Sequence, residues 1–167
     1  MSAVPGPRLP MRDFAHSLPM ALLNAREAVM AGFRPDLEAH DLTEQQWRVL
    51  RILTEQPGIT MGDLAERAAL LRPSLSRIVG RLEQRALIER AQEERDLRRS
   101  RLTMTMAGRR LVREIAPRSE QRYRDIEAAY GPDRLAELHR MLDDLVACVD
   151  DDAVAGMVEG SISEVPV

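Results

Sequence analysis

The segment from residue 60 to residue 82 most limits what this chain can fold into. Thr60 can cap a short helix, and a three-residue connector at 69–71 separates that helix from a second one. Pro73 suits the first turn of the second helix, since its missing N–H would be unpaired there in any case. The apolar residues of the second helix follow at i, i+3, i+4 and i+7, which gives one clean apolar face: Leu75, Ile78, Val79 and Leu82.

A basic hairpin follows this helix pair. Strands are predicted at 87–90 and 99–104, joined by a polar, charged tip at 91–98. Short helix, connector, amphipathic helix and two-stranded hairpin together describe a winged helix-turn-helix. We therefore predict a mainly α fold with a small β-wing (α+β), whose winged helix-turn-helix spans residues 42–104.

The segments on both sides of residues 42–104 are predicted to be helical and to form a dimerisation region, at 17–41 and 105–149. Helical apolar spacing predicts a first helix from Ser17 to about His40, which Pro35 should kink or interrupt. Thr43-Glu44-Gln45-Gln46 is a capping-box pattern that opens the next helix.

The last predicted helix carries the strongest dimerisation signal. Its apolar residues are spaced 3, 4, 3 and 4 apart, as in a coiled-coil seam, and predict a homodimer interface: Leu135, Leu138, Leu142, Leu145 and Val149. Residues 1–16 are predicted to be a flexible arm and residues 150–167 an acidic tail.

The charge is unevenly distributed along the chain. The net charge is −3, yet residues 67–113 hold 13 arginines against 5 acids, and all 24 basic residues are arginine. This predicts a basic middle that contacts a polyanion. Taken with the winged helix-turn-helix pattern, the arginines predict that the polyanion is double-stranded DNA, and the predicted homodimer implies a pseudo-palindromic operator. A solvated charged face is the simpler reading of the charge alone, and a winged helix that binds proteins instead of DNA is a further alternative.

Residues 17–149 resemble the MarR family of bacterial transcription regulators. The most specific match is the run 96–108 (DLRRSRLTMTMAG), which fits Asp-x-Arg, five residues, then hydrophobic-Thr-x-x-Gly, with Met104 where leucine is usual. The recognition-helix pattern matches at 74–83, and Ala86 stands where the family usually has glycine. Stretches at 17–35 and 42–51 are similar to the subgroup that regulates homoprotocatechuate degradation operons, repressors that phenolic acids relieve.

The resemblance implies which residues contact DNA. Arg98 corresponds to the wing-tip arginine that enters the minor groove, and Asp96 to the acid that holds the wing arginines in place. Recognition-helix contacts fall on Ser74, Ser76 and Arg77. Residue chemistry extends the predicted DNA-binding set, which is Arg72, Pro73, Ser74, Ser76, Arg77, Arg81, Asp96, Arg98 and Arg99.

Arg26 interrupts the apolar face of the first helix, because it lies four residues from Leu22 and from Met30. A buried guanidinium needs a partner. That partner is either the carboxylate of an aromatic acid or an internal acid, for example Glu27 of the partner subunit. The subgroup resemblance favours the first alternative, in which a small phenolic carboxylate is the effector. Its predicted site is Arg26, Met30, Phe33, Trp47 and Arg51, with Asn24 and His16 as weaker candidates.

The remaining reactive residues predict no further site. We expect Cys148 to be a small core residue, with a thiol-responsive regulator or a ligand-independent regulator of another operon as the alternative. Three scattered histidines predict no metal site, and we expect no cofactor and no enzyme activity. No apolar run reaches membrane-spanning length and no signal core is present, so a cytoplasmic location and no membrane partner are expected.

Overall fold

The computed structural model describes residues 13–93 and 96–150, which fall into two compact units divided between Ser119 and Glu120. The fold is mainly α with one small sheet, so the predicted α+β class is confirmed. The elements in chain order are η1 (Phe14–His16), α1 (Leu18–Ala31), α2 (Arg34–Glu38), α3 (Glu44–Glu55), β1 (Ile59–Thr60), α4 (Met61–Arg67), α5 (Arg72–Gln84), β2 (Ile88–Glu93), β3 (Asp96–Met104), α6 (Met106–Tyr130) and α7 (Pro132–Asp150).

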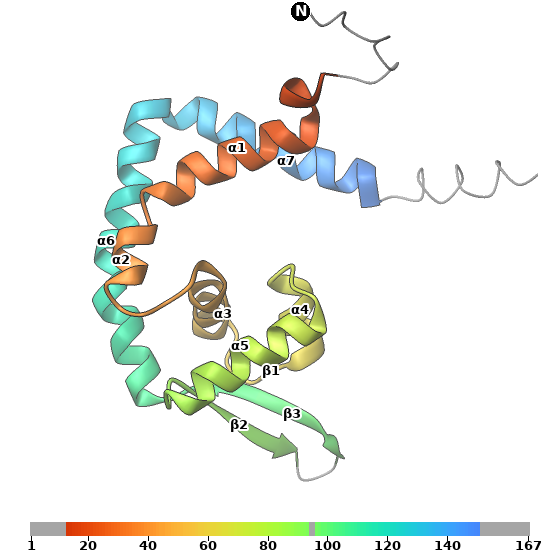
Figure 1. The fold of residues 1–167 in the computed structure, drawn as a ribbon, viewed down its shortest axis with the longest axis vertical. Coiled ribbons are helices and arrows are strands. Elements are labelled where there is room, and N and C mark those ends of the chain that lie inside the picture. Colours follow the sequence, from red (N-terminus) through yellow and green to blue (C-terminus); the bar gives the residue numbers. More distant parts are fainter. Residues whose placement is uncertain (1–12, 94–95, 151–167) are drawn as a thin grey trace, which may run out of the picture. The chain divides into compact units, whose positions relative to one another are not determined.

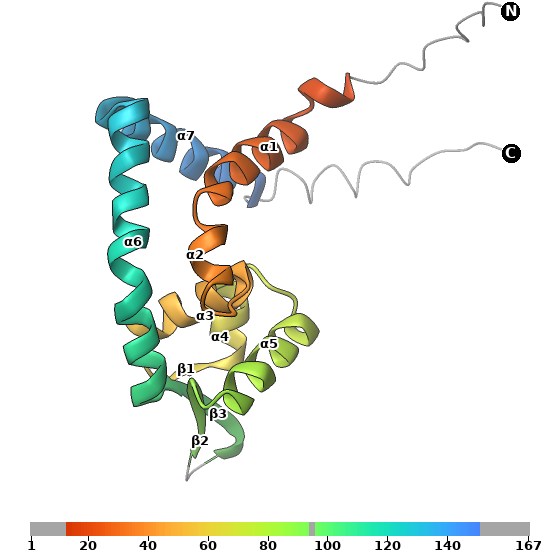
Figure 2. The same ribbon diagram turned by 60° about the vertical axis from the view of Figure 1, so that its left-hand side comes forward.

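Residues 44–104, which we call the winged lobe, hold α3, α4, α5 and the three strands. Figures 1 and 2 show the three helices grouped beside the sheet, with the β2–β3 ribbon extending away from them. The lobe is built on side chains that are at most 1% exposed, and these come from every helix of the lobe and from β3: Val49, Leu50, Leu53, Leu64, Leu75, Val79, Leu82 and Leu102. The predicted apolar face of α5 is therefore confirmed as a core face.

Two helices of the lobe begin where their caps were predicted. The Thr43 hydroxyl accepts from Gln46 N at 3.2 Å, and the Gln46 side chain accepts from Thr43 N at 2.9 Å, which completes the capping box. Thr60 accepts from Asp63 N at 3.2 Å at the start of α4. Such caps depend on residues three apart in sequence, so the sequence alone could locate them.

The predicted first helix is two helices. α1 ends at Ala31 and α2 begins at Arg34, with Pro35 in its first turn. The expectation of one helix as far as His40 is wrong in length. The reason is that proline fits the first turn of a helix, where no N–H bond is required, better than its interior.

The hairpin is longer and better paired than expected. β2 extends to Glu93 and β3 starts at Asp96, so a tip as long as 91–98 is wrong. Charged residues are compatible with a ribbon whose faces are both solvated, so polarity did not mark the turn. The sequence also missed β1, a two-residue strand whose Ile59 pairs with Leu102 of β3.

Ala86, which replaces the family's usual glycine, adopts a left-handed backbone conformation with φ of 52°. The turn is kept nonetheless: Ala86 N donates to Glu83 O at 2.8 Å, and Leu87 N donates to Leu82 O at 2.9 Å. The side chain therefore imposes a steric cost at the C-terminal end of α5 that glycine would not.

Replacing Ala86 with glycine should raise the free energy of unfolding by about 0.5–1 kcal/mol, because the left-handed conformation then carries no Cβ penalty. Urea unfolding followed by circular dichroism measures the change. Equal or lower stability of Ala86→Gly would mean that the turn is not strained in the folded protein.

Candidate nucleic-acid interface and effector site

α5 presents its polar face to solvent along its whole length. Its apolar residues are buried in the winged lobe. Six of the predicted DNA-binding residues lie on this helix; Ser74 is half-buried, and the other five are exposed: Arg72, Pro73, Ser76, Arg77 and Arg81. A helix with this exposed face is narrow enough for the major groove of B-DNA, which its N-terminal residues would meet first.

A polar hollow of about 200 Å³ lies between the start of α3 and the middle of α5. Arg77 and Arg81 line it together with Ser74 and the capping residues of α3. The Arg77 Nε donates to Pro73 O at 3.4 Å, a long bond that leaves most of the guanidinium's donors available. Two guanidinium groups beside one hollow make this face of the lobe attractive to phosphate.

The wing arginines are located by their backbone only. Asp96 of β3 pairs with Glu93 of β2, and Ser100 pairs with Gln92, so the three residues between them have no partner across the ribbon. Arg98 and Arg99 lie in this bulge. Bulges often occur where a strand must redirect its side chains. The side chains of residues 92–100 lie outside the described part of the structure, and the predicted roles of Asp96, Arg98 and Arg99 stay predictions.

Several arginines of the basic segment have acceptors inside the winged lobe or next to it. The Arg85 guanidinium donates to Asp41 O at 2.5 Å and to His40 O at 3.0 Å, and so joins the end of α5 to the turn before α3. Other such bonds are Arg90 to Glu83 (3.2 and 3.3 Å), Arg101 to Gly58 O (3.0 Å) and Arg67 to Glu55 (3.2 Å). Arg48, which precedes the basic segment 67–113, donates to Ala68 O at 2.8 Å. Part of the positive charge therefore stabilises the fold.

Arg26 lies in a network of two arginines and two acids. It donates to Glu27 at 2.6 Å and to Glu44 of α3, while Arg34 donates to Glu44 at 2.6 Å and to Glu27. Each acid thus accepts from both arginines, and the four charges balance. The Arg26 side chain is 43% exposed, so it is not the buried cation that its apolar neighbours suggested. Within one chain its acid partners are Glu27 and Glu44.

The network shifts the pKa of Glu44. Desolvation pushes the pKa upward, but hydrogen bonds from Arg34 and Arg26 outweigh it, so the pKa lies below its ordinary value. The hydrogen bonds that Arg34 donates to Glu44 and Glu27 raise the pKa of Arg34, which stays charged at all relevant pH values. An acid with a lowered pKa stabilises the fold above its unfolded pKa, and this contribution is lost as the pH falls through the folded pKa.

Glu44→Gln should therefore destabilise the protein at pH 7 and much less at low pH. The difference from wild type should shrink once the pH falls below about 4.3, the ordinary glutamate value, because Glu44 then becomes protonated in the unfolded chain and later in the folded one. Urea unfolding at pH 7, 5, 4 and 3.5 measures this. A difference that stays constant over this range would show that the Glu44 charge does not stabilise the fold.

Glu44 also links Arg26 of α1 to α3, the helix that carries Trp47 and Arg51 of the predicted effector site. Trp47 and Arg51 follow Glu44 at i+3 and i+7 on α3, and the Arg51 guanidinium lies 6.0 Å from the centre of the Trp47 ring. On the α1 side, Arg26 bonds to Glu44, Met30 is half-buried, and Phe33 is buried at the start of α2. Trp47 is also part of the core.

The two weaker candidates lie apart from this network. His16 is exposed and its Nδ1 lies 2.6 Å from a carboxylate oxygen of Asp13. Asn24 is exposed two residues before Arg26, a spacing that puts the two side chains on different sides of α1. Glu44 and Arg34, both members of the charged network, were not among the residues predicted from the sequence. The i, i+3, i+7 relation of Glu44 to Trp47 and Arg51 was the available signal.

The residues predicted to join two subunits are incompletely covered within one chain. On α7, Leu135, Leu142 and Leu145 are half-buried, while Leu138 and Val149 are exposed. α1 has no buried residue, and four of its large apolar side chains are exposed: Leu18, Leu22, Leu23 and Val29. Apolar surface of this extent on two helices is typical of an interface.

Other predicted sites can be compared with the described residues. Cys148 is exposed on α7, so the expected buried position is wrong within one chain. Over residues 13–93 and 96–150, no cluster of three or more His, Cys, Asp or Glu side chains could hold a metal ion. No helix in the same ranges is both long and apolar enough to span a membrane.

Comparison with known proteins identifies the family. The MarR family profile matches residues 40–99. The homoprotocatechuate degradative operon repressor of Escherichia coli is 42% identical over 131 residues, which are 78% of this chain and 88% of that repressor. The structure of NadR in complex with 4-hydroxyphenylacetate is 38% identical, with a TM-score of 0.71 over 82% of this chain and 97% of NadR. The repressor CouR, bound to a 23-mer DNA duplex, is 27% identical, with a TM-score of 0.72 over 84% of this chain and 99% of CouR. The chain therefore belongs to the MarR family of transcription regulators.

Proposed function

We propose that this chain is a homodimeric, DNA-binding repressor of an aromatic-acid catabolic operon, of the homoprotocatechuate or 4-hydroxyphenylacetate type. The observation that carries the proposal is the exposed face of α5, where Arg72, Ser76 and Arg77 stand free of the core beside a two-stranded wing. The likeness to the Escherichia coli repressor and to CouR on DNA supports it. Action on chromosomal DNA also fits the cytoplasmic location expected from the sequence.

The proposed contacts divide between positioning and reading. Ser74, Ser76 and Arg77 read base edges in the major groove, while Arg72, Arg81 and Arg99 contact phosphates. Arg98, from the bulge of β3, enters the minor groove, whose narrow A·T tracts attract guanidinium. A two-fold symmetric dimer would present two α5 helices to major grooves one helical turn apart.

Footprinting on the DNA upstream of the chain's own gene tests this proposal. We expect a two-fold symmetric footprint with half-site centres about 10–10.5 bp apart, and affinity that falls steeply as salt rises. Affinity that ignores salt, or protection without symmetry, would contradict the proposal, and the absence of any protection would favour a winged helix that binds proteins.

We propose a phenolic carboxylate as the effector that releases the DNA, with Arg26 as the group that binds its carboxylate. In the charged network, Arg34 already donates to both Glu27 and Glu44. Arg26 can therefore turn to a ligand carboxylate while each acid keeps one arginine partner. Trp47 and Phe33 would supply the apolar surface for the ring. A dimer whose two winged lobes are wrongly spaced for the two half-sites binds DNA poorly. A ligand that binds this form more tightly would therefore weaken DNA binding, and DNA would weaken ligand binding by the same factor.

Replacing Arg26 with alanine should leave a folded dimer that binds its operator but needs about tenfold more effector for release. The lost guanidinium–carboxylate pair contributes roughly 1.5–3 kcal/mol. Arg26→Lys should recover little, since an ammonium cannot copy the planar fork. Titration calorimetry with a panel of phenolic acids measures the affinity, and melting without ligand is the control. Normal acid binding, or simple unfolding, would leave Arg26 as a structural ion-pair residue.

A thiol-responsive regulator is the second candidate, because Cys148 is exposed on α7 beside Val149. Oxidant should then weaken operator binding by wild type but not by Cys148→Ser. Equal behaviour of the two proteins excludes this candidate.

A further inference from the structure

Leu71 is the most exposed large apolar side chain of the described residues, with 78% of its surface open to solvent. It stands at the N-cap of α5, the helix that we propose enters the major groove. No residue in the described part of the chain covers this leucine, unlike Leu75 one turn later, which is fully buried.

Leu71 is also a poor choice for stability. N-cap positions favour Ser, Thr, Asp and Asn, whose side chains accept from free N–H groups of the first turn. α3 and α4 follow this rule with Thr43 and Thr60, whereas Leu71 makes no side-chain cap bond. The residue therefore lowers the stability of α5 and leaves an apolar group in water, a combination that indicates a partner outside the chain.

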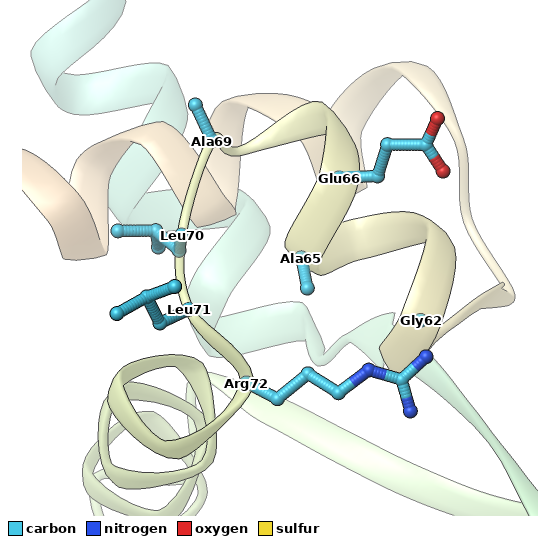
Figure 3. Close-up of a pocket in the computed structure, with 7 residues that line it drawn as sticks. All are labelled: Gly62, Ala65, Glu66, Ala69, Leu70, Leu71 and Arg72. Carbon is cyan, nitrogen blue, oxygen red and sulfur yellow. The ribbon is translucent and has the colours of Figure 1, made fainter. Parts of the chain in front are cut away.

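The surroundings of Leu71 indicate what that partner is. An open hollow of about 490 Å³ lies along α4 and the connector to α5. Figure 3 shows Arg72 running from the start of α5 toward Gly62, while Leu71 points to the other side of the chain. A Cβ on Gly62 would come within 3.4 Å of the Arg72 guanidinium, so glycine leaves room for this arginine. An apolar residue thus precedes a cationic one in the chain, their side chains point to opposite sides, and both residues lie at the end of α5 that also carries Ser74 and Ser76.

We propose that Leu71 is a specificity-determining residue that packs on the 5-methyl group of one thymine in each half-site; the inference rests on the proposed DNA binding. Thymine is the base that presents an apolar group in the major groove. A leucine side chain can contact that methyl group but cannot hydrogen-bond to any base edge. Arg72, on the adjoining residue, would hold the neighbouring backbone phosphate.

Uracil substitution isolates this contact, because deoxyuridine differs from thymidine only by the missing methyl group. Each thymine of the footprinted operator is replaced in turn, and the affinity of the full-length dimer is measured by fluorescence anisotropy. For wild type we expect one position per half-site where uracil weakens binding about fourfold, the effect of one methyl group removed from an apolar contact. Substitution in both half-sites should weaken binding by about 15-fold.

Two variants separate the contact from the fold. Leu71→Ala and Leu71→Ser should both bind the thymine and uracil operators equally at that position. Leu71→Ser should in addition melt a few degrees higher than Leu71→Ala, because serine caps α5. These melting curves also confirm that both variants are folded.

The outcomes are distinct. Wild type that binds its operator but shows no uracil-sensitive position overturns the role of Leu71 and leaves the proposed function intact. The role of Leu71 is also overturned if the variants still prefer the thymine operator to the uracil operator as wild type does. A loss of affinity by the same factor for both operators, as a contact between subunits would produce, keeps that preference and is one such result. Wild type without sequence-specific DNA binding overturns the proposed function together with this inference.

Discussion

Replacing Gly108 with alanine should lower the free energy of unfolding by about 3 kcal/mol, the upper end for overpacking, because the added methyl meets backbone and not a movable side chain. A Cβ at this position would lie 2.1 Å from the carbonyl oxygen of Leu87. The residue that precedes α6 is bonded to the turn at Ala86 and Leu87, because Thr105 N donates to Leu87 O at 3.1 Å and the Thr105 hydroxyl donates to Ala86 O at 2.6 Å. Any shift that relieves the clash must break these bonds.

Gly80 is the matched control for this substitution. It lies in the middle of α5, and a Cβ there would meet nothing within 4 Å. Gly80→Ala should therefore raise the free energy of unfolding by up to about 1 kcal/mol, the helix-propensity difference. Urea unfolding of both variants measures the contrast. If both change stability alike, the close approach of Leu87 to α6 does not exist in solution.

Replacing Leu142 with aspartate should convert the dimer to monomer and abolish operator binding. Leu142 is the central residue of the α7 stripe, which is only half-covered or exposed within one chain. Each leucine that becomes buried contributes roughly 1.5–3 kcal/mol, and the symmetric interface contains two copies. Aspartate adds the cost of burying unpaired charge, so association should weaken by at least about a thousandfold.

Ala147 provides the matched control on the same helix. It is exposed and lies five residues after Leu142, on the side of α7 opposite the stripe. Ala147→Asp adds the same charge and should leave the dimer intact. Sedimentation velocity at micromolar concentration gives the oligomeric state, and circular dichroism shows that both variants are helical. A folded wild-type monomer would refute the predicted interface.

Much of the winged lobe could be predicted from the sequence because its signals are local. The Thr43 and Thr60 caps act over three residues, and the apolar face of α5 repeats within two turns. The interruption before α2 was visible as Pro35, although the length of α1 was not. Such features depend on neighbours within one or two helical turns, which a single sequence displays directly.

Features that depend on distant residues could not be predicted. β1 has two residues, which pair with Leu102 and Arg101 about 40 positions later, and its Ile59 is buried in the core. The partner of Arg26 on α3 is Glu44, 18 residues away, so the sequence showed an unpaired cation where the structure has a balanced network. Tertiary pairing determined both outcomes.

The roles of the arginines in residues 67–113 could be separated only with the structure. The 13 arginines of residues 67–113 favoured DNA binding as a group. The structure separates Arg85, Arg90 and Arg101, whose acceptors lie within the fold, from Arg72 and Arg81 on the exposed face of α5. Variants of the first class should lower stability, and variants of the second should lower DNA affinity.

The central claim is that one dimer binds its operator and that a phenolic carboxylate releases it. Fluorescence anisotropy of labelled upstream DNA, titrated with 4-hydroxyphenylacetate, 3,4-dihydroxyphenylacetate and uncharged phenol, tests both halves at once. We predict sequence-specific binding that at least one of the two acids reverses with saturation and that phenol leaves unchanged. Release of the DNA from the Arg26→Ala variant should need an acid concentration about tenfold higher. Binding that no acid affects, or release by phenol equal to that by the acids, would contradict the account.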